Sequence, residues 1–407
     1  MERTILHCDL NNFYASCECM LDPAIKDKPV AVCGSVEERH GIVLAKNYHA
    51  KRYGVQTAET VHSALAKCPG LIVVKPHFDL YAKYSRLVKR IYMDYTDKVE
   101  SFGLDECWLD ISGKSIDEKK AFYIANEIKE RVKNETGLTI SVGVSFNKVF
   151  AKLGSDMKKP DAVTIITKEK FKEKIWGLPA SALLGVGRST EKLLDKYNIN
   201  TIGDIAAMPK SFFEAKMGKN GARLWENANG NDDSNVTETE CYIPAKTVGH
   251  GTTTRKDMTC LDEVWTTILL LTQDIGYNLR INKQKASGVA VSIRDCNLTT
   301  KQWQCRLPIP TGSSINLAKA AFSLFKRSYG WENPLRSVTV TAIDLVSSTM
   351  PVQLNLFDDN RKFERTEKLE ECAYEVRDRF GIDSIVPATL LGCENLTPKN
   401  SFSHGGL

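Results

Sequence analysis

Apolar residues in the first 180 positions alternate between short continuous runs and stretches with a 3.6-residue period. The runs are typical of buried strands, and the periodic stretches are typical of amphipathic helices. Expected strands cover 4–10, 29–35, 41–47, 71–75, 99–112 (two strands joined by a turn), 139–146 and 162–166. Expected helices cover 12–21, 60–67, 80–96, 117–135 and 148–159. This order predicts a mixed α/β domain built on one sheet.

The pattern changes after about residue 177, where short helices without β-branched runs surround 183–199. Residues 231–245 are polar and have no period, so they are expected to form a linker. Beyond them a split β-α-β-β-α-β order is expected over 246–255, 261–281, 287–295, 300–308, 315–329 and 335–346. A tail from residue 347 contains one more expected helix, 365–381.

The composition excludes several classes of protein. The chain has 407 residues, which suggests several domains, and its 42% hydrophobic and 26% charged residues argue against a disordered or fibrous protein. No apolar run approaches the ~18 residues of a membrane span. Asp9 also lies where a signal peptide needs an apolar core, so we expect a cytosolic protein that enters no membrane. The twelve cysteines contain no CxxC pair, which favours reduced thiols.

The net charge of +5 is small, but it is unevenly distributed along the chain. Residues 1–240 hold 35 basic and 33 acidic residues, residues 241–346 hold 13 and 7, and residues 347–407 hold 7 and 10. A segment of about a hundred residues with this basic excess fits a domain that follows a phosphate backbone. A lysine-rich surface that contacts only solvent explains the charge equally well.

Three carboxylates are placed where a sheet could bring them together. Asp9 ends the first expected strand, and Asp105 and Glu106 lie in the turn of the strand pair 99–112. Carboxylate oxygens suit hard divalent ions, and two such ions can stabilise both oxygens of a phosphoryl displacement. Ordinary turn acids would look the same, because sequence spacing alone does not show that the three side chains meet.

Four motifs carry a family resemblance: DLNNFYASCE at 9–18, NYHAKRYGV at 47–55, GLDECWLDIS at 103–112 and SVGVSFNKVFAKLGSDMKKP at 141–160. In order and spacing they resemble the Y-family translesion DNA polymerases of the DinB/UmuC type, across at least residues 1–346. The wording of the first motif and the tail segment QLNLFDD look closer to UmuC.

The resemblance implies a multidomain α/β fold, a right-hand polymerase with a ferredoxin-like palm, small fingers, a helical thumb with a helix-hairpin-helix and a little finger. The implied boundaries are 1–30 and 77–166 for the palm, 31–76 for the fingers, 167–232 for the thumb, 233–245 for a linker, 246–346 for the little finger and 347–407 for the tail. The implied reaction is template-directed addition of a dNTP to a primer 3′-OH.

The implied active site holds two Mg²⁺ ions on Asp9, Asp105 and Glu106, helped by the backbone carbonyl of Leu10. Tyr14 falls at the steric gate that excludes a ribose 2′-OH. Residues expected to bind the nucleotide are Asn12, Phe13, Tyr14, Tyr48, Lys51, Arg52 and Lys159. Residues expected to cover the nascent base pair are Gly34, Ile42, Leu44 and Ala58. Lys51 and Gly103 depart from the family's usual Arg and Ser, and Lys cannot form the two-pronged phosphate contact of Arg.

Other segments are expected to bind DNA and a sliding clamp. The turn LLGVGRSTEKL at 183–193 has the glycines of a helix-hairpin-helix, which let backbone amides approach a phosphate. Residues expected to contact DNA are Gly185, Gly187, Arg188, Thr254, Arg255, Lys256, Lys285, Arg294 and Arg336. QLNLF resembles the peptide by which bacterial polymerases bind the clamp, through Gln353, Leu354, Leu356 and Phe357. The resemblance of the tail to UmuC also implies an accessory subunit of UmuD type as a partner. The chain itself is expected to be a monomer.

The expected function is therefore DNA synthesis of low stringency on damaged templates. Two alternatives remain open at this stage. A clamp-associated DNA-binding protein with a weak or partner-dependent polymerase site would share the tail and the Lys51 and Gly103 departures. A two-metal nuclease would share the carboxylates, but it would not explain Tyr14 or the basic residues around the triphosphate.

Overall fold

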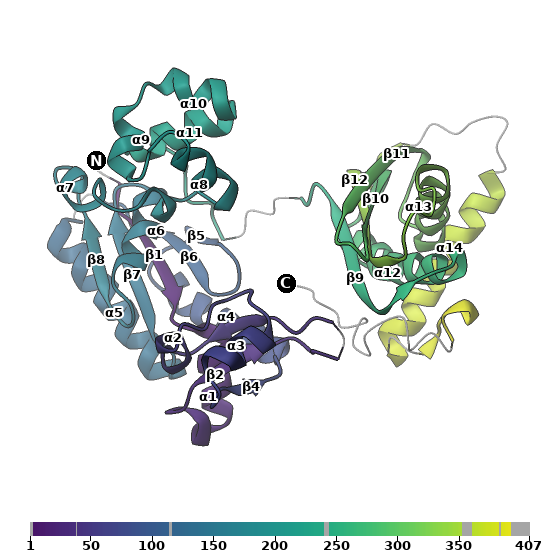
Figure 1. The fold of residues 1–407 in the computed structure, drawn as a ribbon, viewed down its shortest axis with the longest axis horizontal. Coiled ribbons are helices and arrows are strands. Elements are labelled where there is room, and N and C mark those ends of the chain that lie inside the picture. The colour runs from purple at the N-terminus through teal and green to yellow at the C-terminus, as the bar shows by residue number, and fades with distance from the viewer. Residues whose placement is uncertain are drawn as a thin grey trace. The chain divides into compact units, whose positions relative to one another are not determined.

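The computed structural model describes residues 3–37, 39–113, 116–239, 244–351, 360–381 and 384–391, without the side chains of 360 and 362–364. They form two compact units, one of Met1–Gly34 and Ile42–Cys241, the other of Ser35–Gly41 and Tyr242–Leu407 (Figure 1). In the described part of the chain, no helix has both the length and the apolar character that crossing a membrane would need.

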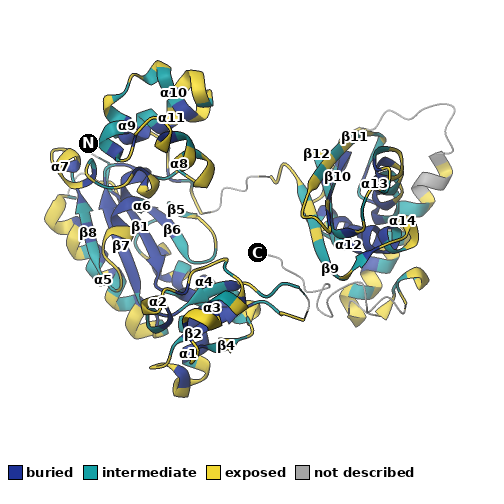
Figure 2. Ribbon diagram, viewed as in Figure 1, coloured by how far each residue is buried: buried dark blue, intermediate teal, exposed yellow. Residues whose placement is uncertain are grey.

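The larger unit is built on a five-stranded sheet with the order β5-β6-β1-β7-β8. Its strands are β1 (Ile5–Leu10), β5 (Val99–Ser101), β6 (Glu106–Asp110), β7 (Ile140–Ser145) and β8 (Val163–Ile166). β1 pairs antiparallel with β6 and β7, whereas β7 and β8 run parallel. Every residue of β1 and β7 is buried, as expected for central strands with both faces covered (Figure 2).

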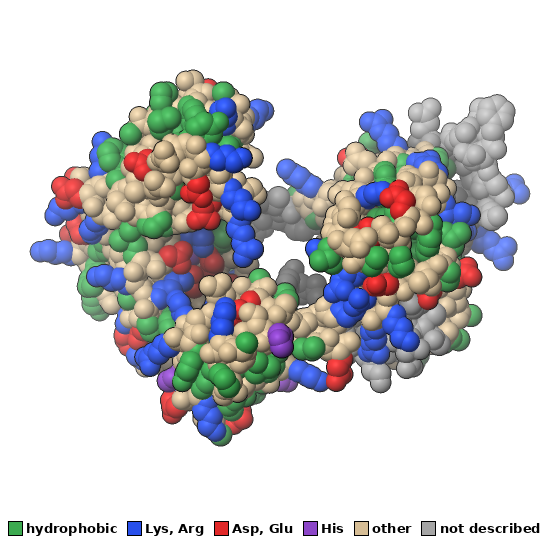
Figure 3. All heavy atoms as spheres, viewed as in Figure 1, with side chains coloured by type: hydrophobic (Ala, Val, Ile, Leu, Met, Phe, Trp, Pro, Cys, Tyr) green, Lys and Arg blue, Asp and Glu red, His purple; other side chains and the backbone are tan. Residues whose placement is uncertain are grey.

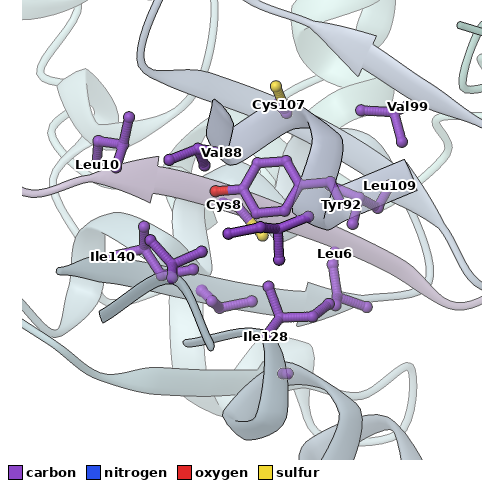
Figure 4. Packing of buried hydrophobic residues seen from close by; sticks show 14 of the residues in the cluster. Leu6, Cys8, Leu10, Val88, Tyr92, Val99, Cys107, Leu109, Ile128 and Ile140 are labelled. Carbon is purple, nitrogen blue, oxygen red and sulfur yellow. The ribbon is translucent and has the colours of Figure 1, made fainter. Parts of the chain in front are cut away.

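Helices cover both faces of this sheet. On one face α1 (Phe13–Leu21), α4 (Phe78–Met93) and α5 (Glu118–Thr136) share a core with the sheet, and the ring of Tyr92 lies among Leu6, Cys8 and Leu109 (Figure 4). On the other face lies α6 (Lys148–Met157). Because side chains alternate along a strand, Asp9 projects from β1 toward this second face.

Two glycines bring α6 close to β7. A Cβ atom on Gly143 would lie 1.9 Å from the carbonyl oxygen of Ala151 and 2.4 Å from the amide of Ser155. A Cβ on Gly154 would lie 3.2 Å from the Cα of Gly143. The helix backbone therefore contacts the sheet backbone directly, which no other residue type at position 143 would allow.

A separate three-stranded sheet with the order β3-β2-β4 contains β2 (Val30–Cys33), β3 (Val43–Lys46) and β4 (Ile72–Val74). With α2 (Tyr48–Arg52) and α3 (Val61–Lys67) it encloses a core of its own. The prediction of a single sheet is therefore wrong, because these strands pair with one another rather than extending the five-stranded sheet. A 3₁₀ turn at Pro23–Ile25 connects α1 to this sheet.

A helical region follows β8 and shares a core with Phe150 of α6. It contains α7 (Phe171–Ile175), a 3₁₀ turn (Ala180–Ala182), α8 (Arg188–Asp195), α9 (Ile202–Ala207), α10 (Lys210–Met217) and α11 (Lys219–Ala228). The next segment then returns to the five-stranded sheet. Val236 is buried beside Ile5 and Trp108, and Thr237 N donates to Glu100 at 2.8 Å. The expected linker is thus packed on the sheet as far as residue 239.

The smaller unit confirms the split β-α-β-β-α-β order. Its elements are β9 (Val248–Met258), α12 (Leu261–Ile281), β10 (Gln284–Asp295), β11 (Thr300–Thr311), α13 (Ser314–Ser328) and β12 (Leu335–Ser347). The sheet order is β11-β10-β12-β9, and both helices share one core with it. The tail helix α14 (Asn360–Phe380), followed by a 3₁₀ turn (Ala388–Leu390), packs on this unit. Glu370 accepts from the amides of Ser314 and Ile315 at 2.9 Å each, and Tyr374 is buried.

Candidate active site

Three carboxylates lie at one end of the five-stranded sheet. Asp9, the penultimate residue of β1, pairs across the strands with Glu106, the first residue of β6. Asp105 directly precedes β6, and its carbonyl oxygen accepts a hydrogen bond from Leu10 N at 3.0 Å. The structure therefore places the three acidic residues that the sequence singled out at the same end of the sheet.

The three carboxylates affect one another's ionisation. Burial, together with the charges of Asp9 and Glu106, raises the pKa of Asp105 to about 6. Burial also raises the pKa of Asp9, although Lys159 opposes this. Burial acts in the same direction on Glu106, but hydrogen bonds from His7 and Lys152 outweigh it and lower the pKa of Glu106 to about 2. Negative charges crowded in a partly dry site are what a hard cation relieves.

Lysine side chains balance two of these charges. Lys159 Nζ lies 2.8 Å from Asp9 and 2.8 Å from Asp156, and Lys152 Nζ pairs with Glu106. Across the residues that the structure describes, no three His, Cys, Asp or Glu side chains are gathered closely enough to hold a metal ion. The donor chemistry of three carboxylates fits a hard divalent cation.

The chain turns sharply from β1 into α1, where Asn12 has a left-handed backbone with φ 49°. Phe13 points into the core, and Tyr14 is half-buried. The Tyr14 ring stacks on the ring of Tyr81, and Phe78 contacts both rings edge-on. Tyr14 is thus one member of an aromatic group at the start of α1.

The expected triphosphate residues are only partly brought together. The charges of Lys159 and Asp9 act on the pKa of Tyr48, which burial raises, so these three residues lie near one another. Lys51 and Arg52 are exposed on α2, with Lys51 Nζ 5.8 Å from the centre of the Tyr48 ring. Lys159 is therefore the expected triphosphate cation that lies beside Asp9. Figure 3 shows acidic side chains in a recess of this unit with basic side chains around it.

The residues expected to cover a base pair lie around the edge of the three-stranded sheet. Gly34 N donates to the Ile42 carbonyl at 3.1 Å, and Ala58 N donates to the Val43 carbonyl at 2.8 Å. Ile42 is 41% exposed, and Leu44 is half-buried in β3. The four residues thus form one local surface.

The expected DNA contacts have different surroundings. Gly185 has φ +100° and Gly187 is the N-cap residue of α8, as suits a helix-hairpin-helix turn. Arg188, Lys256 and Arg294 are exposed, and Arg255 and Arg336 are half-buried. Thr254 is fully buried and donates to the Lys256 carbonyl at 2.6 Å, so its expected DNA contact is corrected to a structural role within the sheet.

Lys285 is a further residue that the sequence predicted to contact DNA. Its Nζ lies 3.0 Å from Glu367 of α14, so this lysine is already paired within its own unit. The expected clamp-binding residues Gln353, Leu354, Leu356 and Phe357 lie outside the described residues.

The sequence reasoning missed residues that surround the carboxylates. His7 Nε2 lies 3.0 Å from Glu106, and burial lowers the pKa of His7, with the Glu106 hydrogen bond opposing. Asn11 is buried, donates to Ser141 Oγ at 2.9 Å and accepts from Asp161 N at 2.9 Å. The period of two along β1 could have indicated His7, because it lies on the same strand face as Asp9.

Comparisons with known proteins identify the family of this chain. Residues 8–156 match the model of the impB/mucB/samB family, and residues 245–356 match the model of its C-terminal domain. The chain is 51% identical over 391 residues to "DNA polymerase IV" of Acetivibrio thermocellus, covering 96% of this chain and 98% of that protein. It is 34% identical over 403 residues to "DNA polymerase IV 1" of Bacillus subtilis, covering 98% and 96%. These names support a DinB-type chain and give no support to the expected closeness to UmuC.

Among solved structures, the chain is similar to a Y-family DNA polymerase chimera, with a TM-score of 0.74 and 22% sequence identity. The match covers 84% of this chain and 99% of the chimera. At this identity the similarity supports the right-hand polymerase fold.

Proposed function

Because the chain belongs to the Y family of DNA polymerases, we propose that Asp9, Asp105 and Glu106 bind two Mg²⁺ ions, with the Leu10 carbonyl as a further ligand. The chain is a DNA-directed DNA polymerase for translesion synthesis, and its family implies a divalent-metal cofactor. The observation that supports this ligand set is the cross-strand pair of Asp9 and Glu106 with Asp105 beside it.

Bound ions would stabilise the attacking and leaving oxygens of the displacement. The chain's own residues then position the reactants. Backbone N–H groups of Asn12, Phe13 and Tyr14 face the triphosphate at the start of α1. The primer 3′-oxygen forms a bond to the α-phosphorus while the bond to pyrophosphate breaks. Lys159 leaves Asp9 when the ion binds and neutralises the departing phosphates, together with Tyr48, Lys51 and Arg52.

Selection against ribonucleotides rests on Tyr14, whose ring occupies the place of a 2′-OH. Gly34, Ile42, Leu44 and Ala58 cover the nascent base pair. Because Ile42 and Leu44 are large side chains, the range of accepted lesions depends on how far this surface can yield.

Primer-template DNA is bound through its phosphates. The Gly185–Gly187 turn and Arg188 contact one segment of backbone, as glycine turns allow. In the smaller unit, Arg255, Lys256, Arg294 and Arg336 follow the duplex without sequence preference, so affinity falls steeply with salt.

The tail adds partners. Gln353, Leu354, Leu356 and Phe357 bind a sliding clamp, which raises the local concentration of the polymerase at the primer end. An accessory subunit of UmuD type is a further partner. The chain works as a monomer in the bacterial cytoplasm.

Primer extension with dNTPs and Mg²⁺ tests the proposal. The full chain should extend a primer, Asp105→Ala should not, and Asp79→Ala, which changes an exposed acid on α4, should match the unchanged protein. Extension that survives in Asp105→Ala would contradict the ligand set. Shortening of the primer would identify a nuclease instead.

A further inference from the structure

His7 links the helix on one face of the sheet to a catalytic carboxylate. Its ring is fully buried, Nδ1 lies 2.8 Å from Ser155 Oγ, and Nε2 lies 3.0 Å from Glu106 Oε2. The ring edge also contacts Trp108, with ring centres 5.2 Å apart. The imidazole thus has defined neighbours at both nitrogens and on its flank.

Ser155 can reach His7 because of the glycine contact between α6 and β7. Gly143 is the cross-strand neighbour of His7, and a Cβ atom there would collide with the backbone of α6 at Ala151 and Ser155. Without that Cβ, the helix lies close enough for Ser155 Oγ to meet the imidazole. The helix position therefore determines the ring position.

In a neutral imidazole one nitrogen donates and the other accepts. Nε2, which lies 3.0 Å from Glu106 Oε2, is the donor toward the carboxylate, so Nδ1 accepts from the Ser155 hydroxyl at 2.8 Å, and this contact fixes the orientation of the ring. The Ser155 oxygen also lies 2.8 Å from the Lys152 carbonyl, which keeps the hydroxyl beside the ring. Lys152 Nζ contacts the same oxygen, Glu106 Oε2, so Oε1 is the oxygen left for a cation.

We propose that His7 is a positioning residue of the polymerase site: anchored by Ser155, it holds Glu106 so that one carboxylate oxygen meets a divalent cation. The inference rests on the proposed metal-binding role of Glu106. Partners that orient a metal ligand in this way typically change metal affinity or activity by about 10- to 100-fold when they are lost. A purely structural role, in which His7 only joins α6 to β1, gives a different result.

Two substitutions separate these roles. In His7→Gln the side-chain amide nitrogen falls near the place of Nε2 and keeps a donor toward Glu106. In His7→Asn it falls near the place of Nδ1 and keeps only the contact with Ser155. The probe is Mn²⁺, titrated by electron paramagnetic resonance into the full chain bound to a dideoxy-terminated primer-template and a dNTP, where no turnover occurs.

His7→Asn should weaken Mn²⁺ binding about 10- to 100-fold, and His7→Gln should retain most of the affinity. In steady-state single-nucleotide insertion, the Asn variant should lower kcat more than it raises KM for the dNTP. Unchanged Mn²⁺ affinity in His7→Asn, or equal losses in both variants, would overturn the proposal. A lower melting temperature of His7→Asn with unchanged Mn²⁺ affinity would also overturn the proposal.

Three further variants complete the test. Ser155→Ala leaves His7 in place and should also weaken Mn²⁺ binding. This variant keeps the proposal testable if His7→Asn does not fold. Unchanged Mn²⁺ affinity in Ser155→Ala would count against the proposal. His62→Gln, an exposed histidine on α3, is the matched control and should change nothing. Normal Mn²⁺ binding by Asp105→Ala would contradict the proposed metal site itself. Reduced binding by Asp105→Ala with unchanged binding by His7→Asn would contradict only the role of His7.

Discussion

The rings of Tyr14 and Tyr81 stack face to face, with centres 4.2 Å apart and planes 9° apart. The Tyr81 hydroxyl in turn donates to the carboxylate of Glu18, which is only 2% exposed. A buried hydrogen bond therefore holds the stacking partner of Tyr14, the proposed steric gate, in place. Tyr14 itself is half-buried.

Tyr14→Ala should admit ribonucleotides. Removing the ring opens the space that a 2′-OH needs, and we expect discrimination between dNTP and rNTP to fall by roughly 100-fold. Single-nucleotide insertion with matched dNTP and rNTP measures the ratio of kcat/KM. Tyr53→Ala, at an exposed tyrosine beyond α2, serves as the control, and unchanged sugar discrimination in Tyr14→Ala would refute the gate assignment.

Gly143→Ala should destabilise the larger unit by about 3 kcal/mol or more. The new Cβ would lie 1.9 Å from a backbone oxygen of α6, and backbone atoms cannot turn away as a side chain can. Urea unfolding measures the change. Gly177→Ala is the matched control, because nothing lies within 4 Å of a Cβ there. Equal stability of the two variants would show that α6 moves aside at little cost.

The stability of the smaller unit should depend on pH through Asp274 of α12. Burial raises the pKa of Asp274 to about 7 from 3.8, although Arg377 of α14 opposes this and His250 Nδ1 of β9 lies 3.3 Å away. The folded chain binds more protons than the unfolded chain between these values, so the free energy of unfolding falls as pH rises from about 4 to about 7.

Asp274→Asn cannot ionise, so it should be more stable than the unchanged protein at pH 8 and nearly equal to it at pH 4. The expected difference is roughly 1 to 4 kcal/mol, since one unit of pKa corresponds to about 1.4 kcal/mol. Urea unfolding at both pH values measures it. Asp262→Asn, at an exposed acid on the same helix, should show no such difference. A difference in the free energy of unfolding that is the same at both pH values would contradict the raised pKa of Asp274.

Deleting residues 353–357 should abolish stimulation by a sliding clamp and leave synthesis without the clamp unchanged. In the proposed role the segment is a docking peptide only, so its loss should leave the active site as it is. Primer extension with and without clamp, on a circular template, measures both quantities. A parallel loss of clamp-independent synthesis would show that the segment supports the fold or the DNA contacts.

The sequence predicted best those elements whose periodicity is strong. The helix expected at 261–281 is α12, with the same bounds, and α5 is shifted by one residue at each end. The sequence also predicted correctly that Asp9 lies at the end of β1 and that Asp105 and Glu106 lie where the next strand pair turns. These features depend on neighbours along the chain, which a pattern records directly.

Features that depend on tertiary approach were missed. The strands at 30–33, 43–46 and 72–74 have ordinary apolar runs, and nothing in them shows with which strand they pair. In the sequence, His7 is one more residue of a buried strand. Its contact with Ser155 forms because Gly143 lets α6 come close to the sheet. Lys285 looks like a surface cation until Glu367, far along the chain, is placed beside it. Such contacts between polar atoms are set by the packing of elements.

The register of β1 has a consequence for how the enzyme matures. A slip of one residue between β1 and β6 would turn Asp9 toward the core and place Cys8 beside Glu106, because side chains alternate between faces. A chain misfolded in this way would keep its overall architecture and still be unable to copy DNA. Correct pairing of two short strands during folding is therefore a checkpoint for activity as well as for stability.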